Sequence, residues 1–164
     1  MTTIAIVTCT ETGGIGIENL FPWPKFFFEE ETFNEVARDR VVLVGRGAFS
    51  QHEYLRGDVT YVLTSNENFG SSDIIKSISG DPADVLEQIQ NENPGKDILI
   101  AGGESLFRAY NDLIDEWYVT IVEEQHIFDK EILLARIKVS HPKHKFLTSG
   151  VDHNQNFSRW HYTK

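Results

Sequence analysis

The sequence predicts an α/β fold with a mostly parallel central sheet, an antiparallel C-terminal edge strand and about four flanking helices. Short apolar runs rich in β-branched residues alternate with helical patterns along the chain. Two of these runs, 41–44 and 98–100, are apolar without interruption. Such runs are typical of strands covered on both faces in a parallel sheet, so we expect helices on both sides.

Further strands are expected at 4–9, 59–63 and 117–122. The segment 157–162 alternates in polarity, which is typical of an antiparallel edge strand with one solvated face.

Four segments between the strands have helical patterns: 25–37, a short stretch after Gly45, 82–90 and 104–111. The third has the clearest start. Asp81 can accept hydrogen bonds as its N-cap, and Pro82 suits the first helical position.

Composition limits the class of protein. With 164 residues, 40% hydrophobic and 24% charged, the chain is expected to form one globular domain, 1–164. A single cysteine, Cys9, cannot build a disulfide framework, and the six scattered histidines argue against a metal site. No apolar run is long enough to span a membrane and no signal peptide precedes the first strand, which predicts a cytoplasmic protein, expected to be a monomer.

The net charge of −10 opposes nucleic-acid binding, because that affinity rests on Lys and Arg at phosphates. An anionic ligand would therefore need a local cationic pocket.

The helix at 25–37 carries a carboxylate on its core-facing stripe. A 3.6-residue period places five residues on that stripe: Phe26, Glu29, Phe33, Val36 and Ala37. Glu30 falls at the edge of the stripe and Glu31 outside it. A buried Glu29 would anchor a cationic or hydrogen-bonding ligand. The alternative is that these acids form a solvated first turn favoured by the helix dipole, and periodicity alone does not exclude it.

Two glycine-bearing junctions follow strands, at 45–47 and 102–103. Glycine permits close backbone approach, so the two junctions could hold the halves of a dinucleotide, and Arg46 favours phosphate. The alternative is two ordinary tight turns. The stretch 13–16 lacks the third glycine of a dinucleotide fingerprint and is expected to be a mobile glycine-rich loop.

These features occur together with several motifs in a fixed order: GGIGIENLFPWP, an acid followed four residues later by Phe, VVLVGR, LTS, IAGGESLF and WYVTIV. In this order the chain resembles the dihydrofolate reductases, from Ile6 to about Asp129. The resemblance favours a buried Glu29 over the solvated alternative, and it implies a dihydrofolate reductase that uses NADPH and takes a small pterin or folate substrate.

The resemblance implies catalytic roles for Glu29, which would bind the amidine edge of the pterin, and for Trp23, which would order water beside it. It implies seven residues at the substrate, namely Ile6, Val7, Glu29, Phe33, Leu55, Arg56 and Thr120. Phe21 would gate the loop 14–20 over the nicotinamide. Arg46 and Ser65 would bind the adenosine 2′-phosphate. The full implied cofactor set is Thr8, Ile15, Gly16, Asn19, Leu20, Gly45, Arg46, Gly47, Ala48, Thr64, Ser65, Ala101, Gly102, Gly103, Glu104, Ser105, Leu106 and Phe107.

The chain departs from the family most seriously at Asp58, where an arginine usually binds the α-carboxylate of the folate tail. Ala37 also replaces the hydroxyl residue that supports this arginine, and Arg56 could substitute if the loop around Gly57 is re-registered. Milder departures are Gly47, Ala48, Phe107 and Lys130. Glu30 replaces an apolar residue and, if it faces the pocket, should weaken binding of apolar antifolates.

Two other functions remain open. Asp58 favours a related pterin or aminopyrimidine reductase that makes weak use of the glutamate tail, although Glu29 followed by Phe33 suits a pterin better. A non-catalytic nucleotide-binding relative could also keep the same glycine loops and strands.

Overall fold

The computed structural model describes residues 1–10, 14–15, 27–66, 69–122, 135–136, 139, 141–152 and 155–164. For residues 14–15, 27–29, 135–136, 152 and 155 the description covers the backbone only.

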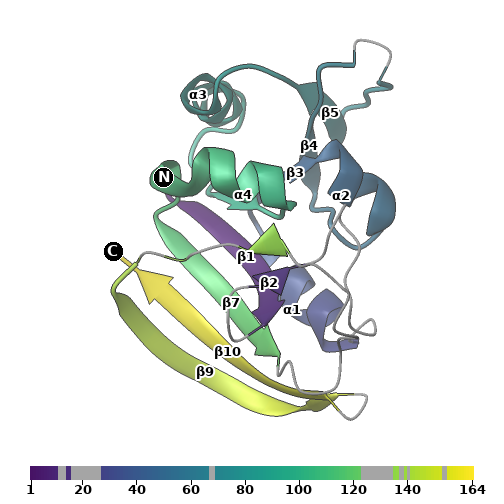
Figure 1. The fold of residues 1–164 in the computed structure, drawn as a ribbon. Helices are drawn as coiled ribbons and strands as arrows, with labels where there is room; N and C mark the ends of the chain where they lie inside the picture. Colours follow the sequence, from purple (N-terminus) through teal and green to yellow (C-terminus); the bar gives the residue numbers. More distant parts are fainter. Residues whose placement is uncertain are drawn as a thin grey trace.

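The centre of the molecule is an eight-stranded sheet with the order β5-β4-β3-β6-β1-β7-β10-β9 (Figure 1). The strands are β1 (Thr3–Thr10), β3 (Val41–Gly45), β4 (Val59–Leu63), β5 (Ile75–Ile78), β6 (Ile98–Ile100), β7 (Glu116–Val122), β9 (Lys143–Asp152) and β10 (Gln155–Thr163). All pairs from β5 to β7 are parallel, and β10 pairs antiparallel with both β7 and β9. A separate two-stranded sheet joins β2 (Gly14–Ile15) to β8 (Ala135–Arg136). The predicted fold class is therefore confirmed.

Four α-helices cover the two faces of the large sheet: α1 (Phe27–Ala37), α2 (Arg46–Gln51), α3 (Pro82–Glu92) and α4 (Glu104–Tyr110), followed by a 3₁₀ turn, η1 (Asn111–Leu113). The core forms two clusters on opposite faces of the sheet. One cluster contains the buried residues of α3 and α4 with Val41, Leu43 and Ile100, and the other contains those of α1 and α2 with Val42, Val44 and Leu99. Neighbouring residues of one strand thus serve opposite layers, which is why these strands are apolar throughout.

The helix predictions hold with small changes at the boundaries. α3 begins at Pro82 as expected, but the Asp81 side chain makes no capping hydrogen bond; its backbone carbonyl accepts from the Val85 amide at 2.9 Å. The missing side-chain bond corrects the sequence-based expectation, because proline at the first position and the buried residues Val85, Leu86 and Ile89 define the helix without it.

Strands β5 and β9 were not expected. β9 pairs outside β10, so the antiparallel edge of the sheet is a hairpin, and the segment 157–162 lies one place in from the edge. The side chains from Lys143 to Leu147 are exposed. An edge strand with solvated faces carries no apolar pattern from which it could be recognised. β5, at the other edge, is only four residues long.

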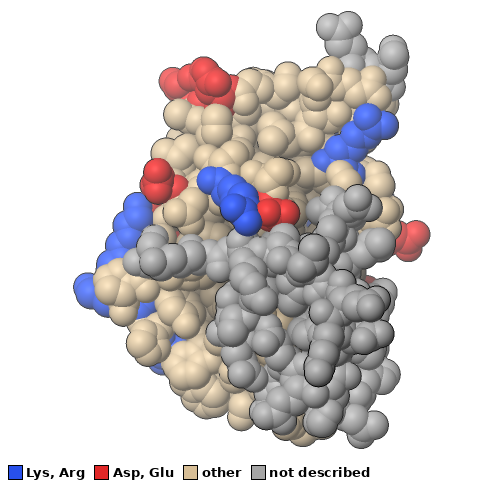
Figure 2. Space-filling model, in the orientation of Figure 1, with Lys and Arg blue, Asp and Glu red and all other residues tan. Residues whose placement is uncertain are grey.

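No helix of the described residues is long and apolar enough to cross a membrane. In the face drawn in Figure 2, the coloured Lys and Arg side chains lie in separate small groups.

Cys9 lies inside the sheet in the α3/α4 cluster, and burial raises the pKa of its thiol from 9.0 to about 12. Burial also raises the pKa of the Tyr110 hydroxyl from 10.0 to about 12. Both groups stay neutral in the folded protein at pH values where the unfolded chain loses the proton. Their stabilising effect is complete below about pH 9.0 and is lost as pH rises toward 12.

We therefore predict that the free energy of unfolding falls above pH 9.0, by about 1.4 kcal/mol per pH unit for the Cys9 thiol alone. Urea denaturation from pH 7 to 11 measures this slope. Cys9→Ala should be less stable at pH 7 but should lose less stability between pH 9 and 10. An unchanged slope in this variant would contradict the assignment to Cys9.

Candidate functional site

The two glycine junctions predicted from the sequence meet at the carboxyl ends of β3 and β6. The Gly45 amide donates a hydrogen bond of 2.7 Å to the Gly102 carbonyl. A Cβ atom at Gly45 would lie 3.4 Å from that carbonyl oxygen and 3.6 Å from the Gly103 nitrogen. Because these glycines carry no side chains, their backbone groups themselves lie at the carboxyl edge of the sheet. This is the edge at which ligands bind in open α/β sheets.

Gly102 has a conformation that favours glycine, with φ of 108° and a cis peptide bond to Gly103. A Cβ atom here would lie 3.3 Å from the Phe107 ring. On either side, the Ala101 amide bonds to the Leu43 carbonyl at 2.9 Å and the Gly103 carbonyl accepts from Phe107 at 3.0 Å. The junction is thus held between β3 and the start of α4.

Arg46 and Ser65 follow two adjacent parallel strands. Gly45 at the end of β3 pairs with Leu63 at the end of β4, so Arg46 and Ser65 leave the same edge of the sheet. Both side chains are exposed, and the Thr64 hydroxyl accepts a hydrogen bond of 3.1 Å from the Asn66 amide. A cation and a hydroxyl placed in this way could bind a phosphate.

The other implied cofactor residues have different environments. Both Gly47 and Ala48 lie in α2; Gly47 is exposed, whereas Ala48 is on the buried face of the helix. Leu106 and Phe107 are buried in the α3/α4 cluster, with the Phe107 ring 5.5 Å from that of Trp117, so only their backbone could reach a ligand at the edge. On the same helix Ser105 is exposed, and Glu104 forms an ion pair of 2.7 Å with Arg108.

The implied substrate residues gather mainly on the α1/α2 face. Phe33 and Leu55 are buried there, and Ile6 packs against the same cluster. In the register of β1 with β7, Thr8 lies opposite Thr120 on this face. The Val7 side chain instead packs in the α3/α4 cluster, on the opposite face of the sheet from Ile6.

Glu29 lies in the first turn of α1, one turn before Phe33. Its side chain lies outside the described residues, and so do Trp23, Gly16, Asn19, Leu20 and Phe21, the Ile15 side chain, and Asp129 and Lys130. The neighbouring Glu30 and Glu31 are exposed, as the helical period predicts.

The loop at Arg56 to Asp58 is closely fitted to the sheet. The Gly57 amide donates to the Thr60 hydroxyl at 3.0 Å, and a Cβ atom at Gly57 would lie 2.8 Å from the Val42 side chain. The Arg56 guanidinium carbon lies 4.3 Å from the centre of the Phe49 ring, and Asp58 is exposed. Arg56 is therefore directed toward α2.

Sequence reasoning missed a second group of residues on the α1 face. Arg159 of β10 lies opposite Thr120 in the antiparallel register, and Tyr118 lies opposite both Ile6 and His161. The period of 157–162 could have placed Arg159 on one face, but only the pairing of β10 with β7 brings it beside Thr120.

The family model described as dihydrofolate reductase matches residues 2–158. A solved structure of dihydrofolate reductase from Enterococcus faecalis, complexed with NADP(H) and RAB-propyl, is similar, with a TM-score of 0.73 and 21% sequence identity. The match covers 99% of this chain and 96% of the other. No curated protein sequence matches this chain.

We predict that Gly102→Ala destabilises the protein by about 1–3 kcal/mol, because alanine is strained at φ of 108° and its methyl group presses on Phe107. Gly70→Ala is the matched control, since no described atom beyond its chain neighbours lies within 4 Å of the added Cβ, and its effect should stay within about 0.5 kcal/mol. Urea midpoints of the two variants make the comparison, and equal midpoints would refute the tight fit at Gly102.

Proposed function

This chain belongs to the dihydrofolate reductase family, and from that membership we propose that it reduces 7,8-dihydrofolate to tetrahydrofolate with NADPH. The observation that carries the proposal is the family match across residues 2–158. The contact between Gly45 and Gly102 supports it, because it leaves an edge open to a dinucleotide.

The described residues fit a dinucleotide at the carboxyl edge of the sheet. The backbone of 45–47 and 102–103 would lie along the phosphates, and Arg46 with Ser65 would bind a 2′-phosphate. When bound, NADPH would supply the hydride for C6 of the dihydropterin. Phosphate recognition by Arg46 is what would distinguish NADPH from NADH.

On the substrate side, Phe33, Leu55 and Ile6 form an apolar wall against which a pterin ring can pack. Glu29 would hydrogen-bond the amidine edge and fix the orientation of the ring, while water near Trp23 would bring the proton to N5. The apolar wall would exclude other water from the reacting atoms.

Asp58 is the specific observation that favours a second candidate, a pterin reductase with weak use of the glutamate tail. A carboxylate at this exposed position would repel the tail. Arg56 points toward Phe49 and offers a different position for the tail carboxylate.

The experiment that separates these functions follows NADPH oxidation with dihydrofolate, with a dihydropterin that lacks the tail, and with no acceptor. We expect turnover with dihydrofolate. Equal turnover without the tail favours the second candidate. Tight NADPH binding without turnover on either pterin indicates a non-catalytic relative.

We also propose that the protein is a cytoplasmic monomer. Light scattering of the purified protein should give the mass of one chain, 18.7 kDa.

Glu29→Gln should fold normally but lose turnover by at least about 10²-fold at pH 7, because the amide cannot support the protonated substrate. Glu31→Gln is the matched control, two residues away and exposed, and should keep full activity. Steady-state kcat for both variants tests this, and near-normal turnover in Glu29→Gln would remove Glu29 from the mechanism.

Arg46→Gln should raise the KM for NADPH by about tenfold and leave the KM for NADH unchanged, because only NADPH has a 2′-phosphate. Arg38→Gln, at an exposed position after α1, controls for loss of one positive charge. If the KM rises equally for NADPH and for NADH, Arg46 does not bind the 2′-phosphate.

A further inference from the structure

The C-terminal hairpin of β9 and β10 carries positive charge in a chain that is acidic elsewhere. Residues 141–164 contain four Lys or Arg and one Asp, which gives +3, so residues 1–140 account for −13 of a total of −10. One group of Lys and Arg side chains in Figure 2 lies along the margin where Figure 1 places β9 and the C-terminus. Positive charge gathered on one part of an acidic molecule favours contact with a negatively charged partner there.

The two edges of the large sheet differ in how their backbone groups are satisfied. At β5 the chain closes its own edge: the Ser77 amide donates to the Ser71 hydroxyl at 3.2 Å, and the Ser72 amide donates to the Ile75 carbonyl at 2.7 Å. At β9, the opposite edge, no described residue satisfies the outward-facing backbone groups of 143–146 in this way. This stretch therefore offers the free donors and acceptors of an extended strand.

Apolar side chains are exposed along the same edge. Among the described residues five large apolar side chains are exposed, and three of them belong to β9: Phe146, Leu147 and Val151. Phe146 is 50% exposed, although its ring packs on that of Trp160 with the two centroids 5.4 Å apart. Apolar groups that gather on a surface, rather than lying singly, mark interaction sites.

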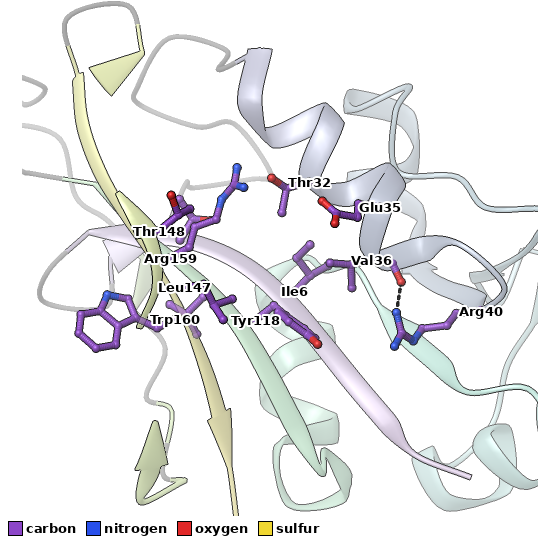
Figure 3. Close-up of a pocket in the computed structure, with 12 residues that line it drawn as sticks. Ile6, Thr32, Glu35, Val36, Arg40, Tyr118, Leu147, Thr148, Arg159 and Trp160 are labelled. Atoms are coloured by element: carbon purple, nitrogen blue, oxygen red, sulfur yellow. Dashed lines mark hydrogen bonds between the residues drawn. The ribbon is translucent and has the colours of Figure 1, made fainter. Parts of the chain in front are cut away.

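Positive and aromatic side chains of β9 lie on opposite faces of the sheet. Lys145 pairs with His161, whose ring stacks on Tyr118 of the α1/α2 cluster. Phe146 pairs with Trp160, and Figure 3 shows the Trp160 ring turned away from α1. Because cross-strand partners share a face, Lys145 lies on the α1 side of the sheet and Phe146 on the other side.

The same alternation extends to the start of β9. Lys143 shares the face of Lys145, and His144 shares that of Phe146, up to the point after Phe146 where the β9–β10 register shifts. Neither lysine forms an ion pair with a described residue. A strand added outside β9 would meet a positive charge at every second position and an aromatic ring between. Acidic residues that alternate with apolar ones match this pattern.

We propose that β9 binds an extended acidic segment of another protein, which pairs as an additional strand along 143–146. Its Glu or Asp side chains lie opposite Lys143 and Lys145, and its apolar side chains contact His144 and Phe146. Main-chain hydrogen bonds hold the segment, and the alternating side chains select it. The inference does not rest on the proposed function.

The probe is the capped, fluorescently labelled peptide Glu-Val-Glu-Val-Glu-Val, titrated with the full chain and followed by fluorescence anisotropy. We expect saturable binding with a Kd below about 1 mM. Lys145→Glu should weaken binding by at least about fivefold, because it places like charges opposite each other. Lys96→Glu, at an exposed position before β6, makes the same change of charge and should bind as the original protein does.

Two further comparisons test the apolar and the backbone contacts. Phe146→Ser should weaken binding by at least about threefold. Ile74→Ser is its matched control, since Ile74 is 59% exposed and lies outside β9, and it should have no effect. The same peptide N-methylated at every residue keeps its charge but has no amide donor, so it should not bind.

The proposal is overturned if the peptide does not bind at about 1 mM, if it binds Lys145→Glu as tightly as the original protein, or if the N-methylated peptide binds as well as its parent. It is also overturned if the purified protein forms a dimer that Phe146→Ser dissociates, because the edge then belongs to a second copy. Circular dichroism establishes which variants fold, and Lys145→Gln, which only removes the charge, replaces Lys145→Glu if the latter does not.

Discussion

The hydrogen bond from the Gly45 amide to the Gly102 carbonyl is the contact on which the rest of the site depends. It joins the ends of β3 and β6 at the point where α2 and α4 begin. A Cβ atom at Gly45 would already be in van der Waals contact with the opposing backbone. The close approach therefore fixes the spacing of the two junctions and, through them, the position of a bound dinucleotide.

The parallel strands and the four helices could be predicted because their signals are local. Val41 to Val44 are apolar in an unbroken run, and both clusters of the core need them. β9 could not be predicted in this way, since its stability comes from pairing with β10 and its side chains from Lys143 to Leu147 are exposed. Its position at the edge depends on long-range pairing, which leaves no periodic signal.

In the candidate site too, residues with a local sequence signal could be predicted, whereas those that depend on long-range strand pairing could not. The glycines, Arg46 and Phe33 could be identified from motif order, and the structure brings the two glycine junctions into contact. The different faces of Ile6 and Val7 follow from strand geometry once β1 is placed in the middle of the sheet. Arg159 could not be placed beside Thr120, because Thr120 is 39 positions earlier in the chain and only the β10–β7 register brings them together.

The long outer edge of β9 has a consequence for the behaviour of the molecule in solution. A free strand edge can pair with another chain, and positive side chains on such an edge oppose that pairing. Lys143 and Lys145 are both exposed on β9 in an otherwise acidic protein. Two copies approaching edge to edge would bring these lysines together, so salt, by screening the repulsion, should weaken the protection against self-association.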